Sequence, residues 1–204
     1  MTVTKLTEIS KSRVQVMIDN EFAFVLYKGE LRIYHIREGE EIEAEAYQEI
    51  MQQLLPKRAK LRAMNLLKSR AYTRKQLCDK LKSSGYPQEV IEEALSYVSS
   101  FGYINDRQYA CDFIEYNKER KSRTGICNAL MQRGIHRAVI EDAWEEMTAG
   151  DGNLERNQIL AWVRKKNFDP DSATYEEKQK FCAFLYRKGF QTDAIRSVLS
   201  LDII

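Results

Sequence analysis

The sequence predicts a mostly α-helical protein, in which three tandem three-helix repeats in an elongated arrangement follow a small antiparallel β segment at the N-terminus. Three observations predict this fold class. Strand-like runs fill the N-terminal segment, helical periodicity holds from about Ala59 onward, and one apolar pattern recurs three times around a glycine. The predicted parts are a β-rich extension with a helix and then three helical repeats, at residues 1–55, 56–104, 105–149 and 150–204.

The N-terminal segment carries the pattern of β-strands. Arg13–Ile18 alternates apolar and polar residues, which is typical of a half-buried strand. Two further runs, Phe22–Tyr27 and Leu31–Ile36, are rich in the aromatic and β-branched residues that strands favour. Turn-forming pairs, Asp19-Asn20 and Lys28-Gly29, separate these runs. We therefore expect three or four short strands in an antiparallel sheet with one face in solvent.

The repeat is defined by Gly85, Gly134 and Gly189. Apolar residues stand eight and four positions before each glycine, directly after it, and five, six, nine and ten positions after it. This spacing predicts one helix that ends at the glycine and a second helix that buries a stripe of side chains. The glycine itself suits the left-handed position that ends many helices.

A further helix is expected ahead of each of these pairs. The three predicted first helices are Ala59–Arg70, Asp106–Arg120 and Leu154–Lys166. The chain is expected to turn helical near Glu41 and to break at Pro56, because proline disrupts helix interiors. Capping boxes are expected to open two of the middle helices, at Thr73 with Gln76 and at Thr174 with Glu177.

The cysteines indicate packing positions and no metal site. Cys78, Cys127 and Cys182 each stand seven positions before the glycine of their own repeat, and Cys111 stands apart. There is no C-x-x-C pair, and zinc sites require ligands at such short spacing. We therefore expect free thiols that pack against the core, with no metal and no cofactor.

No catalytic motif is present in the sequence. The nine glycines form no phosphate-binding loop, and neither H-E-x-x-H nor G-x-S-x-G occurs. The adjacent carboxylates Glu92/Glu93 and Glu145/Glu146 are expected on solvated helix faces, since acid–base pairs need opposed groups in a cleft. We therefore expect no catalytic residues, and a binding protein in place of an enzyme.

Positive charge is concentrated in one part of the chain. Residues 1–55 hold 6 lysine and arginine against 10 aspartate and glutamate residues, so their net charge is −4. Residues 56–84 hold 10 basic residues against Asp79 alone, so their net charge is +9. Such an asymmetry favours a polyanionic partner.

Basic residues also recur at one place in each repeat, near the end of its first helix. In the first repeat they also lie on the helix face opposite the buried stripe of Ala59, Ala63, Leu66 and Leu67. These residues either complement helix dipoles and keep the surface soluble or contact phosphates along a nucleic-acid backbone. Their recurrence favours phosphate contact. The candidate residues for binding a nucleic acid or a protein partner are Lys57, Arg58, Arg62, Lys68, Arg70, Arg74, Lys75, Lys118, Arg120, Lys121, Arg123, Arg164, Lys165 and Lys166. Tyr72, Tyr86 and Tyr103 are candidates for base stacking, although their spacing favours core or half-buried positions.

These motifs resemble the RecX family of recombination regulators. The resemblance covers nearly the whole chain and is most specific over residues 63–147 and weaker beyond Gly150. Val16–Ile36 is similar to the N-terminal extension of longer members. The matching residues in the repeats are Leu67–Arg70, Thr73, Leu77, Leu81, Gly85-Tyr86, Gly102–Asp106, Tyr109-Ala110, Gly125, Leu130 and Gly134-Ile135.

The resemblance implies a cytoplasmic bacterial protein that binds the RecA recombinase filament on single-stranded DNA. Family members typically restrain RecA and so limit strand exchange and the SOS response to DNA damage, although some act as positive modulators. Duplex DNA is a further candidate partner, a membrane is not, and the protein is expected to be a monomer. Residues Met1–Ser10 lack the apolar core of a signal peptide, which agrees with a cytoplasmic location.

Two alternatives remain open from the sequence. The first is a stand-alone DNA-binding protein of helix-turn-helix type, although no single helix concentrates the arginine, asparagine and glutamine residues that read bases. The second is a helical scaffold that binds only proteins, for which binding insensitive to salt and no affinity for DNA would be diagnostic.

Overall fold

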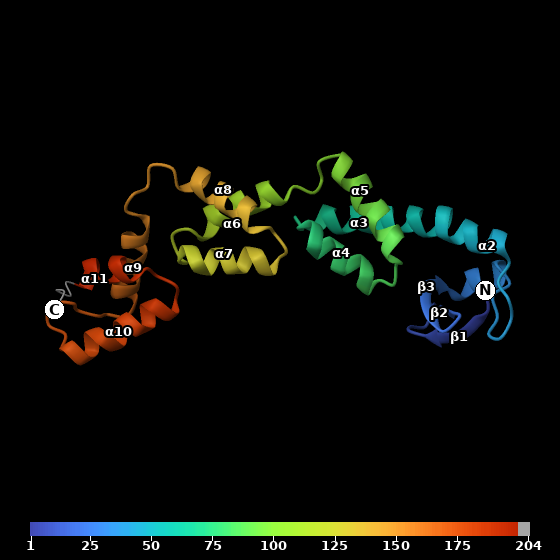
Figure 1. Cartoon of the computed structure of the whole chain (residues 1–204), viewed down its shortest axis with the longest axis horizontal. Coiled ribbons are helices and arrows are strands. Elements are labelled where there is room, and N and C mark those ends of the chain that lie inside the picture. The colour runs from blue at the N-terminus through green and yellow to red at the C-terminus, as the bar shows by residue number, and fades with distance from the viewer. Residues whose placement is uncertain (200–204) are drawn as a thin grey trace. The chain divides into compact units, whose positions relative to one another are not determined.

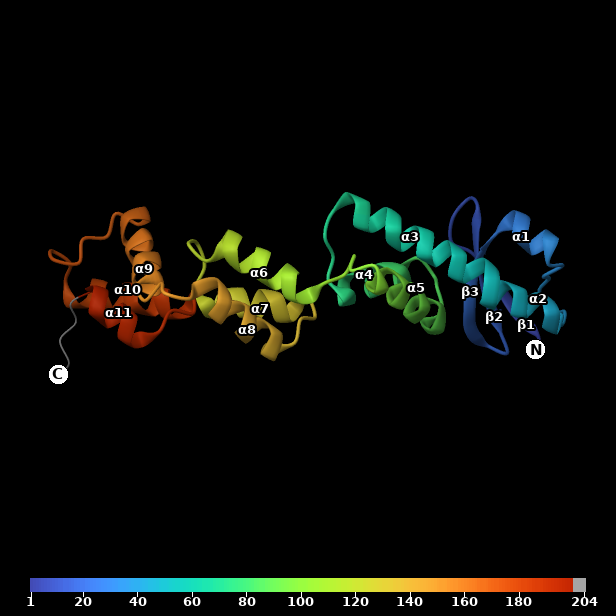
Figure 2. The ribbon, with the colours of Figure 1, turned by 90° about the horizontal axis from the view of Figure 1, so that it is seen from above.

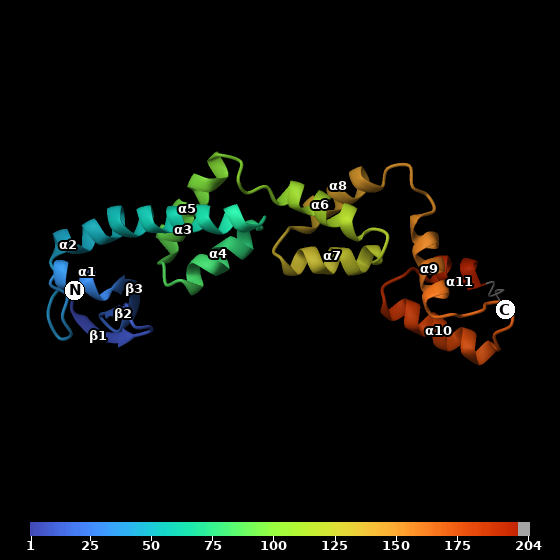
Figure 3. The same cartoon turned by 180° about the vertical axis from the view of Figure 1, so that it is seen from behind.

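The structure, a computed structural model, describes residues 1–199 (Figure 1). The chain divides into two compact units, of which the first spans Met1–Asn105 and the second begins at Asp106. The first unit contains a small sheet and a three-helix bundle, and the second contains two three-helix bundles (Figures 1 and 3). The predicted fold class, mostly helical after a small antiparallel sheet, is therefore confirmed.

The sheet has three antiparallel strands in the order β1-β2-β3, namely β1 (Val3–Glu8), β2 (Arg13–Ile18) and β3 (Glu21–Tyr27). The alternation predicted for β2 is confirmed, because Val14, Val16 and Ile18 are buried while their neighbours are not. The predicted turn is also present. Asp19 and Asn20 both adopt positive φ, at 50° and 68°, which a tight turn between antiparallel strands requires.

The prediction of a strand at Leu31–Ile36 was wrong. Lys28–Ile33 is the short helix α1, and its first turn is stabilised because the Tyr27 amide donates to Glu30 Oε2 at 2.8 Å. Lys28-Gly29 therefore starts a helix where a turn was expected. The strand that was missed is β1, whose alternation is interrupted because its register with β2 shifts between Val3 and Lys5.

The break expected at Pro56 does not occur. The chain is helical without interruption through α2 (Ala44–Glu49), the π-helical segment η1 (Ile50–Leu54) and α3 (Leu55–Ser69). Proline cannot donate to the carbonyl four residues earlier and collides with it in a regular α-helix. The wider π-helical segment, which ends at Leu54, two residues before Pro56, accommodates that defect.

Three-helix bundles follow, and Figure 2 shows their helices from a second side. In each bundle the middle helix ends at one of the repeat glycines, which have φ of 87°, 85° and 87°. The amide one residue past each glycine donates to the carbonyl four residues before that glycine, which is the predicted left-handed helix end. The remaining helices are α4 (Arg74–Ser83), α5 (Gln88–Ser100), α6 (Asp106–Asn117), α7 (Arg123–Gln132), α8 (Arg137–Thr148), α9 (Leu154–Lys165), α10 (Tyr175–Arg187) and α11 (Thr192–Leu199).

The repeated apolar residues build the core of each bundle. Those of α4 and α5 share one hydrophobic cluster with the sheet, whereas α6–α8 and α9–α11 each enclose a cluster of their own. The residues eight and four positions before each glycine are buried in all three bundles. The division of the chain after residues 55, 104 and 149 stays a prediction, since the first bundle and the sheet have a common core.

The helix caps and thiols follow the repeat as well. Both predicted capping boxes form, at Thr73 and at Thr174, and Ser122 caps α7 by accepting from the Gly125 amide at 3.1 Å. The three repeated cysteines are half-buried and pack against the hydrophobic core of their own bundle, and Cys111 is buried. Burial raises the pKa of each of these four thiols. Over residues 1–199, no side chains cluster as a metal site and no helix is long and apolar enough to cross a membrane.

Candidate functional site

The predicted basic residues lie mainly in three clusters, one in each helical bundle. The first cluster (Lys68, Arg70, Arg74, Lys75) runs from the end of α3 into the first turn of α4. The second cluster (Lys118, Arg120, Lys121, Arg123) occupies the turn between α6 and α7 and the first residue of α7. The third cluster (Arg164, Lys165, Lys166) ends α9.

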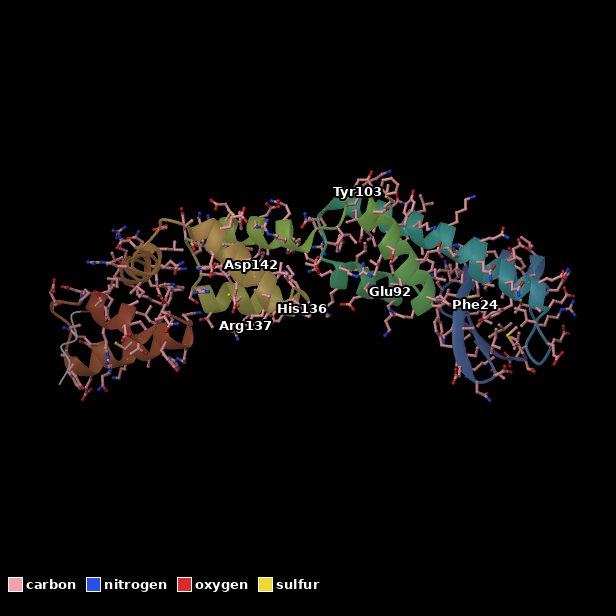
Figure 4. The ribbon with its side chains drawn as sticks, turned by 45° about the horizontal axis from the view of Figure 1, so that its top comes forward. Phe24, Glu92, Tyr103, His136, Arg137 and Asp142 are labelled. Carbon is pink, nitrogen blue, oxygen red and sulfur yellow. The ribbon has the colours of Figure 1, made fainter. Side chains whose placement is uncertain are left out.

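The first cluster is exposed, and its charges have different partners. Arg74 pairs with Glu92 on α5 at 2.6 Å, and Figure 4 shows where Glu92 lies on that helix. Lys75 pairs with Asp79 one turn further along α4, at 2.9 Å. The Arg70 guanidinium lies 4.4 Å from the centre of the Tyr72 ring. All these ion pairs are solvent-exposed, so each contributes little to stability and leaves the cations available for a polyanion.

The other predicted residues on α3 are not equivalent to one another. Lys57 and Arg62 are exposed. Arg58 is half-buried, because its side chain forms an ion pair with Glu30 and covers the Tyr27 ring at 4.7 Å. The basic face of α3 is thus partly covered by the end of the sheet, and Arg58 is held there.

The second cluster lies in a turn where the sequence predicted helix. α6 ends at Asn117 and not at Arg120, because the Asn117 carbonyl accepts from the amides of Arg120 and Lys121 in a tight turn. The exposed cations of this cluster lie over aromatic rings. The pairs are Arg120 over Tyr116 at 5.6 Å, Lys121 over Phe113 at 5.5 Å and Arg123 over Trp144 at 5.7 Å.

A buried glutamine fixes the second cluster in position. Gln158 on α9 is 3% exposed, and its side-chain amide donates to the carbonyls of Lys118 and Lys121. Lys118 is also held by Glu115 at 2.6 Å and by the Met147 carbonyl at 3.2 Å. The turn that carries the cations is therefore attached to the neighbouring bundle.

Replacing Gln158 with leucine is expected to destabilise the second unit by about 1–3 kcal/mol, because two hydrogen bonds, each with a net contribution of about 0.5–1.5 kcal/mol, are lost. Urea unfolding followed by tryptophan fluorescence reports on this unit, since both tryptophans, Trp144 and Trp162, belong to it. Gln179→Leu is a suitable control, because Gln179 is exposed on α10 and its replacement is expected to change stability by less than about 0.5 kcal/mol. If both variants lowered the free energy of unfolding equally, Gln158 would not be what holds this turn in position.

The third cluster surrounds two packed aromatic rings. Lys165 lies 4.9 Å from the Trp162 ring and Lys166 lies 5.4 Å from the Phe184 ring, and the two rings meet edge to face at 5.3 Å. Lys188 lies within 5.7 Å of both rings and is therefore a neighbour of this cluster.

Sequence reasoning missed two basic residues, Lys188 and Arg133. Arg133 covers the Phe113 ring at 4.6 Å, beside Lys121 of the second cluster. Both residues stand directly before the repeat glycine of their bundle, and the first bundle has Ser84 at that position. The signal that identifies them is therefore the repeat register itself, read one position before the glycine.

The tyrosines considered for base stacking separate into two groups. Tyr72 and Tyr86 are 7% and 8% exposed, which confirms that they are core residues. Tyr103 is 52% exposed and stacks on Phe101 with ring centres 5.8 Å apart, so its expected core or half-buried position was wrong. Tyr103 lies beyond the end of α5, as Figure 4 shows, and helical spacing does not determine its burial.

The four carboxylates predicted to be solvated are exposed. Glu93 pairs with Lys60 at 2.7 Å, and Glu146 pairs with Arg107 at 2.5 Å.

The three clusters together offer exposed guanidinium and ammonium groups next to aromatic rings. Such groups suit contact with phosphates or with acidic protein surfaces.

Comparisons with known proteins agree with this architecture. Residues 59–97 match a family model described as the first three-helix domain of RecX, and residues 155–199 match the third three-helix domain of RecX. The second match lies beyond Gly150, where the motifs of the sequence resemble this family less closely. The regulatory protein RecX of Caldanaerobacter subterraneus subsp. tengcongensis is 34% identical, over 98% of this chain and 100% of the relative. The regulatory protein RecX of a Clostridium botulinum strain is 29% identical, over 98% of this chain and 94% of the relative.

Two solved structures share the fold. A crystal structure of a regulatory protein RecX superposes with a TM-score of 0.64 at 22% identity and covers 98% of both chains. A crystal structure of RecX from Lactobacillus salivarius superposes with a TM-score of 0.63 at 23% identity, over 72% of this chain and 95% of the other. With the full-length identity to the Caldanaerobacter protein, these results establish that the chain belongs to the RecX family of regulatory proteins.

Proposed function

We propose that this chain regulates homologous recombination and DNA repair by binding the RecA filament on single-stranded DNA and inhibiting its growth or activity. In this proposal the protein is a cytoplasmic monomer that performs no chemistry of its own and modulates the SOS response through RecA. Family membership supports RecA as the partner, because the relatives are named regulatory protein RecX.

The observation that carries the proposal is the recurrence of exposed cations at one place in each bundle. A DNA strand presents phosphates at regular intervals, and a filament on that strand presents one subunit surface repeatedly. A protein with three similar basic clusters matches such a periodic partner, whereas a helix-turn-helix reader concentrates its contacts in one recognition helix. The clusters also lie away from the buried stripes, so a partner can contact them without any unfolding of the bundles.

The proposal is tested by adding the full-length protein to RecA on single-stranded DNA and measuring ATP hydrolysis and strand exchange. The wild-type protein is expected to reduce both rates at stoichiometric amounts. A triple variant of the first cluster, Lys68→Gln with Arg70→Gln and Lys75→Gln, is expected to need at least about tenfold more protein for the same inhibition, since the loss of one charged contact of about 1.5 kcal/mol already corresponds to that factor.

A charge-matched control separates the cluster from overall charge. Lys5→Gln with Arg32→Gln and Arg37→Gln removes three exposed cations from the acidic N-terminal part, and one of them, Arg37, is ion-paired with Glu40 as Lys75 is with Asp79. This control is expected to inhibit like the wild type. No effect of the wild-type protein on RecA would contradict the proposal. Tight sequence-selective binding to duplex DNA without RecA would favour the helix-turn-helix alternative, and partner binding without any affinity for DNA would favour the scaffold.

A further inference from the structure

A pocket with a volume of about 350 Å³ lies in the first unit between the sheet and the helical bundle. Three arginines line it: Arg13 at the start of β2, and Arg58 with Arg62 one turn apart on α3. Two tyrosines, Tyr27 and Tyr86, line it as well. The pocket thus combines several hydrogen-bond donors with a size at the lower end of small-molecule sites.

The fold brings these groups together through the first repeat glycine. Gly85 packs so closely on β3 that a Cβ atom would stand 2.2 Å from Val25 Cγ2. This close approach places the end of α4 against the sheet, and Arg13 Nη1 lies 3.5 Å from the Ser84 carbonyl. The pocket therefore results from the packing of the bundle on the sheet, and neither part would form it alone.

The pocket carries an excess of positive charge. Glu30 forms an ion pair with Arg58, and among residues 1–199 no carboxylate pairs with Arg13 or Arg62. Three guanidinium groups and one carboxylate leave a net charge of +2. Burial raises the pKa of the Tyr86 hydroxyl, against the nearby charges of Arg58, Arg62 and Arg13, so this hydroxyl stays a proton donor at neutral pH.

We propose that this pocket binds the phosphoryl group of a phosphate ester. The guanidinium fork matches phosphate oxygens in geometry, and a phosphoryl dianion balances the net charge of +2, whereas a carboxylate would leave one positive charge uncompensated. The ester belongs either to a free nucleotide or to the phosphorylated end of a nucleic-acid strand. This site goes beyond the proposed function, which depends on the clusters in the turns and helix ends and does not require the pocket.

The site is tested by calorimetric titration of the full-length protein with inorganic phosphate, AMP and ATP. We expect at least one of these probes to bind with a Kd below about 1 mM, and we expect Arg13→Gln and Arg62→Gln each to weaken that binding about tenfold or more. Arg32→Gln is the matched control, because Arg32 is exposed on α1 and does not line the pocket. This variant should bind the phosphate probes with the same affinity as the wild type.

Oligonucleotides distinguish the two sources of the phosphate. Tighter binding of a 5′-phosphorylated strand than of the same strand with a 5′-hydroxyl, lost in Arg62→Gln, would assign the pocket to a strand end. Equal binding of both strands together with binding of AMP or ATP would assign it to a nucleotide. Arg62→Lys keeps the charge and loses the fork, so an intermediate affinity is expected. Absence of binding by every phosphate probe, or equal binding by the wild type, Arg13→Gln and Arg62→Gln, would overturn the proposal, and RecA inhibition would be unaffected by that result.

Discussion

Replacing Gly85 with alanine is expected to destabilise the first unit by about 2–5 kcal/mol. Two costs add up at this residue. Its φ of 87° costs a residue with a Cβ about 1–2 kcal/mol, and the new methyl group would overlap Val25, which costs about 1–3 kcal/mol more. Hydrogen exchange measured by mass spectrometry localises the effect, since faster exchange is expected in the sheet and α3–α5 and not in α6–α11.

Gly102→Ala is the matched control, because Gly102 also has positive φ, at 71°, but a Cβ there would meet nothing within 4 Å. Its replacement is expected to cost only the backbone part, about 1–2 kcal/mol. In a Val25→Ala background the cost of Gly85→Ala should fall by about 1 kcal/mol, since the nearest methyl groups are gone. Equal costs for Gly85→Ala and Gly102→Ala would show that the contact with Val25 is unimportant.

The repeat glycines Gly85 and Gly189 each have two roles. Besides ending the helix, Gly189 approaches the start of α7, where a Cβ would stand 2.8 Å from Thr124 Cβ and 2.9 Å from Ser122 Oγ. Ser122 Oγ in turn donates to the Lys188 carbonyl at 2.5 Å. In each case the helix end packs against an element outside its own bundle and earlier in the chain, β3 for Gly85 and the start of α7 for Gly189. The sequence pattern predicted the helix end, and the contact became visible only in three dimensions.

Periodicity explains which parts of the fold were predictable. The apolar stripes, the glycine helix ends and the capping boxes depend on residues close in the chain, and they are present as predicted. The predictions failed where the structure depends on contacts beyond the local sequence. Strand β1 was missed because it pairs with β2 across a register shift, and the break expected at Pro56 is absent because a π-helical turn accommodates the proline. Local propensity carries little information on either feature.

The candidate site, too, was predictable from the sequence only in part. Recurrence along the sequence located the three clusters, because each lies at or just beyond the end of the first helix of its bundle. The partners of these cations come from other helices: Glu92 for Arg74, Trp144 for Arg123 and Gln158 for the turn that carries Lys118. The pocket at Arg13 and Arg62 was also beyond sequence reasoning, since its residues meet only when the sheet packs on the bundle.

Neutralising the third cluster is expected to reduce the salt dependence of binding to single-stranded DNA. Each phosphate contact on a single strand contributes a slope of about −0.7 to a plot of log K against log salt concentration. Replacing Arg164, Lys165 and Lys166 with glutamine should therefore make the slope about 2 less negative. Fluorescence anisotropy of a labelled oligonucleotide between about 50 and 200 mM salt measures it.

The control for this variant removes three exposed cations from other positions of the same bundle, Arg156, Lys180 and Arg196. If the cations act only by general electrostatic attraction, the slope becomes less negative by the same amount in both variants. If they contact phosphates directly, it becomes less negative mainly in the cluster variant. The rings of Trp162 and Phe184 remain in both, so any stacking on bases is unchanged. Equal slopes in the two variants would contradict direct phosphate contact by the third cluster. In that case an effect of this cluster on RecA would have to arise from contact with the RecA protein.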